Sequence, residues 1–165
     1  MAICLIILGV LTRLIPHIPN FSPLVGIALF SGTYLKKRYS FLVPLGIYIL
    51  SDVVIGLHKT VIFTWASIIL IYFVGRYLKN RKTIANLFIY TFFSSCLFFI
   101  ITNFGVWLLG WYPPNLAGLI QCYILALPFF RTSLLANFIY AGMLFGMYEY
   151  LLKRKHKHLK ENIAF

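Results

Sequence analysis

Apolar residues form long blocks along this chain, and polar residues gather in the short segments between them. The blocks cover residues 2–15, 22–35, 41–57, 61–78, 84–110 and 131–152, with a further amphipathic stretch at 114–129. A helix needs about 20 residues to cross ~30 Å of hydrocarbon, and open sheet edges cannot lie there, so each block predicts a membrane helix. The first two blocks are short, and the two prolines in residues 16–20 exclude a continuous helix. These blocks form either two short tilted spans or a partly inserted hairpin.

The composition supports a polytopic membrane protein. Of the 165 residues, 61% are hydrophobic and only 11% are charged, about half the charged share of a soluble globular domain. A soluble domain of this length could not bury so much apolar surface. We therefore expect an all-α integral membrane domain of six transmembrane helices over residues 1–152, followed by a basic cytoplasmic tail over residues 153–165.

The basic residues lie mostly on one side of the predicted helices. Twelve of the 15 fall in alternate connections: Lys36, Lys37, Arg38, Arg76, Lys79, Arg81, Lys82, Lys153, Arg154, Lys155, Lys157 and Lys160. The opposite connections hold only Arg13, Lys59 and Arg131. By the positive-inside rule both termini are cytoplasmic, and segments 16–22, 57–61 and 110–131 face outward across the inner membrane. The net charge of +12 thus indicates orientation, and we expect no nucleic-acid partner.

Three polar residues are predicted at a similar depth below the outer surface. Asp52, Asn103 and Asn137 lie roughly 8–11 Å inside the outer ends of their helices at 1.5 Å per residue. Aromatic residues share their helical stripes, including Tyr48 and Trp107. This layer predicts an outward-open cavity between helices, lined by polar and aromatic side chains.

Asp52 is the only acid in the outer half of the chain. A carboxylate at a helix centre costs about 2.5–3.5 kcal/mol on insertion scales, so it should face the bundle or a wet cavity and have a partner. Lys59, His58, Arg13 and Arg131 are the candidate partners. The alternative to a functional role is a structural ion pair or an interhelical hydrogen bond, and for the two asparagines helix packing is the favoured role.

The outer loops supply further candidate contacts. His17 and Asn20 lie in a segment stiffened by prolines. A rigid segment loses less entropy on closing over a ligand. The third loop contains Trp107, Cys122 and Tyr123, for which the alternative is the aromatic belt found at membrane interfaces. Because this loop is long and apolar, we expect residues 114–129 to form a short interfacial helix between helices 5 and 6, over the mouth of the bundle.

Several kinds of chemistry have no sequence support. The chain contains no HExxH, GxSxG or GxxxxGK[ST] motif, so we expect neither an enzyme nor a resident cofactor. The three cysteines have no CxxC spacing and predict neither a disulfide framework nor a zinc site. Without a nucleotide site, active transport would require an external motor.

Several segments together resemble a known family. They are residues 13–23 (RLIPHIPNFSP), 51–52 (SD), 102–107 (TNFGVW), 112–113 (YP) and 118–130 (GLIQCYILALPFF). Over residues 12–148 the chain is similar to small bacterial membrane proteins of unassigned substrate that resemble the substrate-binding S components of energy-coupling-factor transporters. The resemblance implies an S-component-like six-helix bundle, a micronutrient bound between the outer helix ends, and energy supplied by a membrane coupling protein and two cytoplasmic ATPases. The AxxxA docking pattern of many S components is absent from the first helix here.

Three classes of function follow. The leading hypothesis is a transport subunit that binds a vitamin-like or heterocyclic micronutrient through Arg13, His17, Asn20, Asp52, Asn103, Trp107, Cys122, Tyr123, Arg131 and Asn137. In it Asp52 and the asparagines make polar contacts and Trp107 and Tyr123 stack on the ligand. The second is a non-transporting subunit that docks a partner through the Gly142–Gly146 step. The third is a membrane enzyme using His17, Asp52 and His58.

Overall fold

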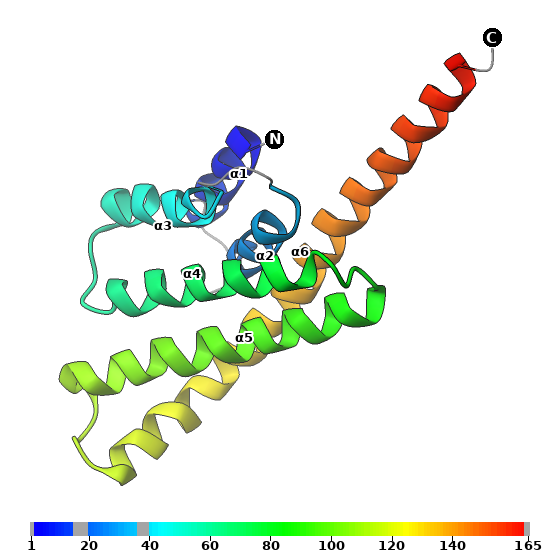
Figure 1. The fold of residues 1–165 in the computed structure, drawn as a ribbon. Coiled ribbons are helices and arrows are strands. Elements are labelled where there is room, and N and C mark those ends of the chain that lie inside the picture. Colours follow the sequence, from blue (N-terminus) through cyan, green and yellow to red (C-terminus); the bar gives the residue numbers. More distant parts are fainter. Residues whose placement is uncertain (1, 15–19, 36–39, 164–165) are drawn as a thin grey trace.

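The computed structural model describes the backbone of residues 2–14, 20–35 and 40–163, and the side chains of residues 5–14, 20–35 and 40–157. These parts of the chain form six helices and no strand, as the apolar blocks predicted. The helices are α1 (Ala2–Leu14), α2 (Leu24–Tyr34), α3 (Leu42–Ile55), α4 (Val61–Leu78), α5 (Ile84–Val106) and α6 (Leu116–Ile163); a π-helical turn, η1 (Trp107–Trp111), extends α5 (Figure 1).

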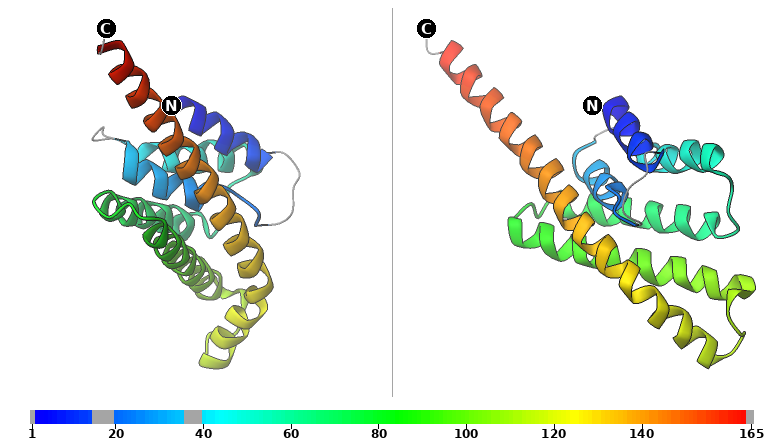
Figure 2. Two further views of the ribbon diagram at one scale, coloured as in Figure 1. Left: turned by 90° about the vertical axis from the view of Figure 1, so that its right-hand side faces the viewer. Right: turned by 180° about the vertical axis from the view of Figure 1, so that it is seen from behind.

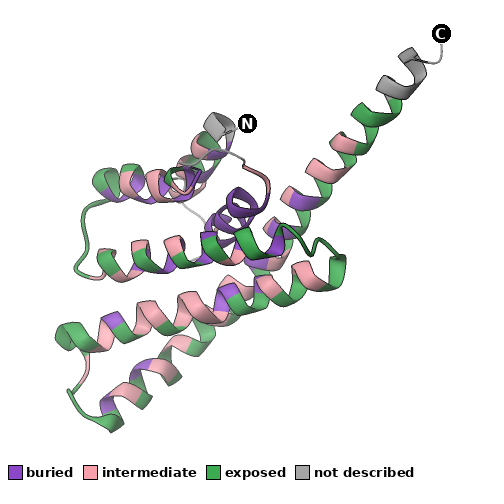
Figure 3. Ribbon diagram, viewed as in Figure 1, coloured by how far each residue is buried: buried purple, intermediate pink, exposed green. Residues whose placement is uncertain are grey.

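The short helix α2 lies at the centre of the bundle. Residues 24–33 are all buried, and α2 contacts each of the other five helices. Figure 3 shows α2 as the most completely buried helix, whereas the outer faces of α4, α5 and α6 are largely exposed. A helix that is apolar on all sides belongs in an interior, and α2 is covered by protein.

Two glycines allow α2 and α4 to cross in close contact. A Cβ atom on Gly32 would lie 2.1 Å from the Tyr72 carbonyl oxygen, and one on Gly75 would lie 2.3 Å from the Leu29 carbonyl oxygen. Both distances are far below van der Waals contact, so any side chain at either position would push the two backbones apart. Ala28, which lies one turn before Gly32, is also small and buried, so this face of α2 packs closely on its neighbours.

Three helices are long and apolar enough to cross a membrane. Their spans are Val61–Leu78, Ile84–Trp111 and Leu116–Lys157, whereas α1, α2 and α3 have 13, 11 and 14 residues. Large apolar side chains are exposed along the long helices, including Phe73, Phe93 and Leu135. This exposure suits contact with lipid chains, so the long helices indicate a multi-pass membrane protein. That all six helices cross the membrane stays a prediction.

The prediction of a separate interfacial helix over residues 114–129 was wrong. Residues 116–163 form one 48-residue helix, about 72 Å long at 1.5 Å per residue. Pro128 lies inside it, with its ring in an exposed turn, and membrane helices tolerate such a proline where local adjustments satisfy the freed carbonyl. The boundary drawn at residues 152/153 also has no structural break, because α6 continues through the basic segment.

The three loops that the structure describes in full lie at two opposite ends of the bundle. The α3–α4 loop (residues 56–60) and the α5–α6 loop (residues 112–115) lie at the end we call the Asp52 end, on the left in Figure 1. The α4–α5 loop (residues 79–83) lies at the opposite end, which we call the basic end, and α6 extends past it towards the C-terminus (Figures 1 and 2). The charge pattern predicted this separation of the loops into two sets.

Candidate functional site

The centre of the candidate site is an ion pair between α1 and α3. Arg13 Nη2 lies 2.7 Å from Asp52 Oδ1, and the side chain of Asp52 is only 1% exposed. Arg13 Nη1 donates a hydrogen bond of 2.7 Å to Ser51 Oγ. Ser51 in turn donates to the carbonyl oxygens of its own helix, which fixes its hydroxyl as the acceptor for Arg13. Of the four partners predicted for Asp52, Arg13 makes the closest contact and His58 lies at 4.0 Å.

Aromatic side chains enclose this pair. The Arg13 guanidinium lies over the Tyr48 ring, 4.4 Å from its centroid, a cation–π geometry. Trp65 on α4 donates its indole N–H to Asp52 Oδ2 at 2.8 Å. Both carboxylate oxygens of Asp52 therefore have a charged or hydrogen-bonding partner, as a buried carboxylate requires. We call Arg13, Tyr48, Ser51, Asp52, His58 and Trp65 the charged cluster.

A glycine turn places His58 beside the cluster. Helix α3 ends at Gly56, whose φ of 114° few other residues adopt and whose N–H caps the Asp52 carbonyl at 2.9 Å. The loop then turns back, and His58 Nε2 lies 4.0 Å from Asp52 Oδ1. His58 Nδ1 is hydrogen-bonded to Thr60 Oγ1 at 2.8 Å, which orients the ring. The His58 side chain is 42% exposed and connects the buried pair with the surface.

Four other predicted site residues lie together on the α5–α6 hairpin: Asn103, Trp107, Cys122 and Tyr123. Cys122 is buried and its thiol lies 3.4 Å from the Asn103 carbonyl oxygen. The Tyr123 hydroxyl donates to the Ile100 carbonyl at 2.7 Å. The Asn103 amide bonds to the Phe99 carbonyl of its own helix. These polar groups contact helix backbone, an arrangement typical of helix packing.

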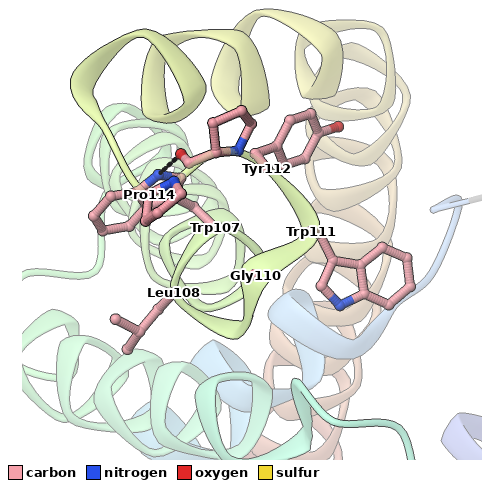
Figure 4. Close-up of a pocket in the computed structure, with 7 residues that line it drawn as sticks. Trp107, Leu108, Gly110, Trp111, Tyr112 and Pro114 are labelled. Atoms are coloured by element: carbon pink, nitrogen blue, oxygen red, sulfur yellow. Dashed lines mark hydrogen bonds between the residues drawn. The ribbon is translucent and has the colours of Figure 1, made fainter.

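Trp107 lines a shallow cavity at the tip of this hairpin. Its volume is about 440 Å³, and its lining consists of Trp107, Leu108, Gly110, Trp111, Tyr112, Pro113 and Pro114. The indole N–H of Trp107 donates to the Pro113 carbonyl at 3.0 Å (Figure 4). Leu108 and Trp111 point away from the turn on opposite sides in Figure 4. We call this open, aromatic-lined cavity the aromatic hollow.

The charged cluster and the aromatic hollow share the Asp52 end. The first turns of α4 lie between them, because Trp65 reaches Asp52 while the Phe63 ring packs on Gly105 of α5. A Cβ atom on Gly105 would lie 2.4 Å from that ring. Trp65 is not among the residues that the sequence predicts for the site, although its place one turn after a polar loop could have indicated an N–H donor near the helix end.

The structure does not bring Asp52, Asn103 and Asn137 together. Among the described residues, α3 packs on α1, α2 and α4, whereas Asn103 and Asn137 lie on α5 and α6. Asn137 is 1% exposed and donates to Ser95 Oγ at 2.9 Å across the α5–α6 interface. The three residues were predicted at a similar depth along their own helices, but they lie in different environments.

The remaining predicted site residues lie elsewhere. Arg131 is exposed about four turns into α6, because the predicted outer loop 110–131 is reduced to residues 112–115. Asn20 is exposed with a φ of 63°, directly before Phe21, whose ring packs edge-on against Tyr140 of α6. His17 lies outside the described residues. Within the described part of the chain, no three His, Cys, Asp or Glu side chains are placed to hold a metal ion.

One family model matches nearly the whole chain. A family model described as a family of unknown function, DUF6580, matches residues 1–159. The chain belongs to this family. No curated protein and no solved structure matches it. The DUF6580 model covers nearly the whole chain. The similarity to S components stays a prediction.

Proposed function

We propose that this DUF6580 protein is a membrane transport subunit that binds a small micronutrient, vitamin-like or heterocyclic, at the Asp52 end and delivers it inward. The observation that carries the proposal is the buried Arg13–Asp52 pair with its aromatic enclosure. Ionisable residues inside apolar helices are expensive, and where they occur they usually mark substrate or ion pathways. The pair lies beside a loop rather than deep between helices, which suits a site that a solute reaches from one face.

The surroundings of the pair support a ligand with a ring system. Tyr48 and Trp65 flank the charges, and the aromatic hollow lies across the first turns of α4 at the same end. Aromatic faces stack on heterocycles, while a few polar groups in an apolar lining fix their orientation. In this proposal Trp107 contributes stacking.

The orientation and the energy source belong to the same proposal. With the basic end in the cytoplasm, the Asp52 end faces outward across the inner membrane. The resemblance to S components supplies the rest: a membrane coupling protein and two cytoplasmic ATPases would drive release of the ligand inside. The protein itself would contribute recognition.

Native mass spectrometry of the protein purified from its own cells tests this function. The expected result is a small molecule retained by the wild-type protein and lost from Asp52→Ala. Glu149→Ala is the matched control, since it removes a carboxylate from the ion pair at the opposite end of the protein. A protein that retains no small molecule, in cells whose uptake is unaffected by Asp52→Ala, would contradict the proposal.

A second candidate function is docking of a partner protein. A Cβ atom on Gly142 or Gly146 of α6 would meet no atom within 4 Å, so this small-residue step faces open space. Such steps let a second membrane helix approach closely. A partner that copurifies with the wild type and is lost from Gly142→Leu, independently of any ligand, would favour this function over transport.

A further inference from the structure

The members of the charged cluster differ in how far they reach the surface. The carboxylate of Asp52 is enclosed, with one oxygen facing Arg13 and the other bonded to Trp65. Arg13 retains 16% exposure, and His58 is far more open. A solute arriving at this end therefore meets N–H donors and cationic groups before it meets the acid.

The charge balance at this end is positive. The chain has three acidic residues; Glu149 lies at the basic end beside Lys82, and Glu161 lies in the last turns of α6. Asp52 is thus the only acid of the charged cluster. Facing it are Arg13 of α1 and His58 of the α3–α4 loop, where the exposed Lys59 follows. On α3 and α4, the uncharged side chains of Tyr48 and Trp65 also face Asp52.

Arg13 has donors left for a ligand. A guanidinium carries five N–H groups in a planar fork. Among the described residues, one Nη1 hydrogen bond goes to Ser51, and Nη2 faces Asp52. The Tyr48 ring covers one face of the plane, so the guanidinium is held in a fixed orientation. A pre-oriented fork with free donors at a partly exposed edge suits bidentate binding of a carboxylate or a similar oxyanion.

We infer that the ligand of the proposed transport subunit is an organic anion whose carboxylate or equivalent oxyanion binds Arg13, with the exposed Lys59 adding positive charge nearby. This inference rests on the proposed function and narrows its substrate class. Asp52 is then a positioning residue that holds the guanidinium on Tyr48. It does not contact the ligand, in contrast to the role that the sequence predicted for it.

A series of probes that differ only in charge tests the inference. The full-length protein in phosphatidylcholine nanodiscs is titrated with benzoate, benzamide and benzylamine, and binding is measured by ligand-observed NMR with empty nanodiscs subtracted. The variants are Asp52→Asn, the double variant Arg13→Gln/Asp52→Asn, and Arg81→Gln. The double variant removes both charges together, so it leaves no unpaired buried charge to unfold the bundle. Arg81→Gln is the matched control, because it removes an arginine that also lies over a tyrosine ring, that of Tyr77, but at the basic end.

In the wild type and in Arg81→Gln, benzoate should bind about ten-fold more tightly than benzamide, the scale of one charge-assisted hydrogen bond. Benzylamine should bind most weakly. Asp52→Asn should weaken benzoate by a few-fold at most and keep the order of the three probes, since Arg13 is still present. The double variant should bind benzoate and benzamide alike. A purely structural role for Asp52 would instead weaken all three probes equally.

Three outcomes would overturn the inference. One is equal binding of acid and amide by the wild type, and another is a preference for benzylamine that Asp52→Asn abolishes. The third is no binding of any probe in the millimolar range, since an open cationic site should accept a simple aromatic acid at that concentration. None of these outcomes decides the proposed function, which depends on the mass of the molecule that the native protein retains.

Discussion

The two ion pairs at opposite ends of this protein have the same kind of charges and very different surroundings. Arg13 and Asp52 lie 2.7 Å apart with side chains 16% and 1% exposed. Lys82 and Glu149 lie 3.9 Å apart with side chains 41% and 40% exposed. Each pair has aromatic neighbours: Arg13 lies over Tyr48, and Lys82 lies 4.9 Å from the centroid of Tyr34. The chemical difference between the two ends is therefore burial.

Burial decides what each pair contributes. An exposed pair gains little, because water and salt screen it and two long side chains lose freedom. A buried pair is a poor source of net stability, yet loss of one partner leaves an uncompensated charge in an apolar setting. A charge at the basic end can thus be replaced at little cost in stability. At the Asp52 end, stability depends on both partners of the pair. We regard such dependence as the mark of a site, since packing alone could have used apolar residues there.

The largest expected effect is that of breaking the buried pair. Arg13→Met should lower the free energy of unfolding in detergent by about 3–5 kcal/mol, because the Asp52 carboxylate then has no cationic partner at hydrogen-bonding distance. The double variant Arg13→Met/Asp52→Leu should recover most of this loss. Chemical denaturation followed by circular dichroism measures both. A double variant as unstable as the single one would show that the pair is not coupled.

A smaller effect is expected from the indole that satisfies the second carboxylate oxygen. Trp65→Phe keeps the ring but removes the donor to Asp52 Oδ2, which should cost about 1–3 kcal/mol in the same assay. Trp111→Phe is the control, since Trp111 is 69% exposed and its replacement should change stability by less than about 0.5 kcal/mol. Equal effects of the two replacements would mean that the hydrogen bond to Asp52 contributes nothing.

The smallest effect is expected at the basic end. Glu149→Gln removes the charge that faces Lys82 but keeps an acceptor for the Tyr34 hydroxyl, which donates to Glu149. The loss should be at most about 1 kcal/mol and should shrink further as salt is added. A loss as large as that of Arg13→Met would remove the distinction between the two ends.

Much of the fold could be predicted from the pattern of apolar residues. The predicted block 61–78 coincides with α4, and the blocks 22–35 and 41–57 contain α2 and α3 with one to two extra residues at each end. The error came at α6. Pro128 and the polar groups near Arg131 suggested a boundary, but apolar residues continue on both sides of it. A proline removes one hydrogen bond, and the long helix tolerates that loss.

The site was less predictable than the fold. Asp52 could be selected from the sequence because acids are rare in this chain, and Arg13 was one of four candidate partners. Which cation pairs with it depends on the packing of α1 along α3, and so does the contact with Trp65, which arrives from α4. Helical rise gives the depth of a residue along its own helix. It does not give the rotation of that helix or its neighbours, which is why Asn103 and Asn137 do not lie beside Asp52.

The amino-acid pattern establishes that this chain forms apolar helices, that its loops separate into a strongly basic set and a weakly basic set, and that Asp52 needs a partner. These conclusions follow from local composition and from the cost of placing charge in hydrocarbon. Three features appear only in the folded protein: α2 is the central helix, α6 is continuous, and the carboxylate of Asp52 is enclosed while the guanidinium of Arg13 stays partly exposed. The physical reason is that burial belongs to contacts between distant segments. The glycine crossing of α2 and α4 and the packing of α1 on α3 create those contacts, and no single segment contains them.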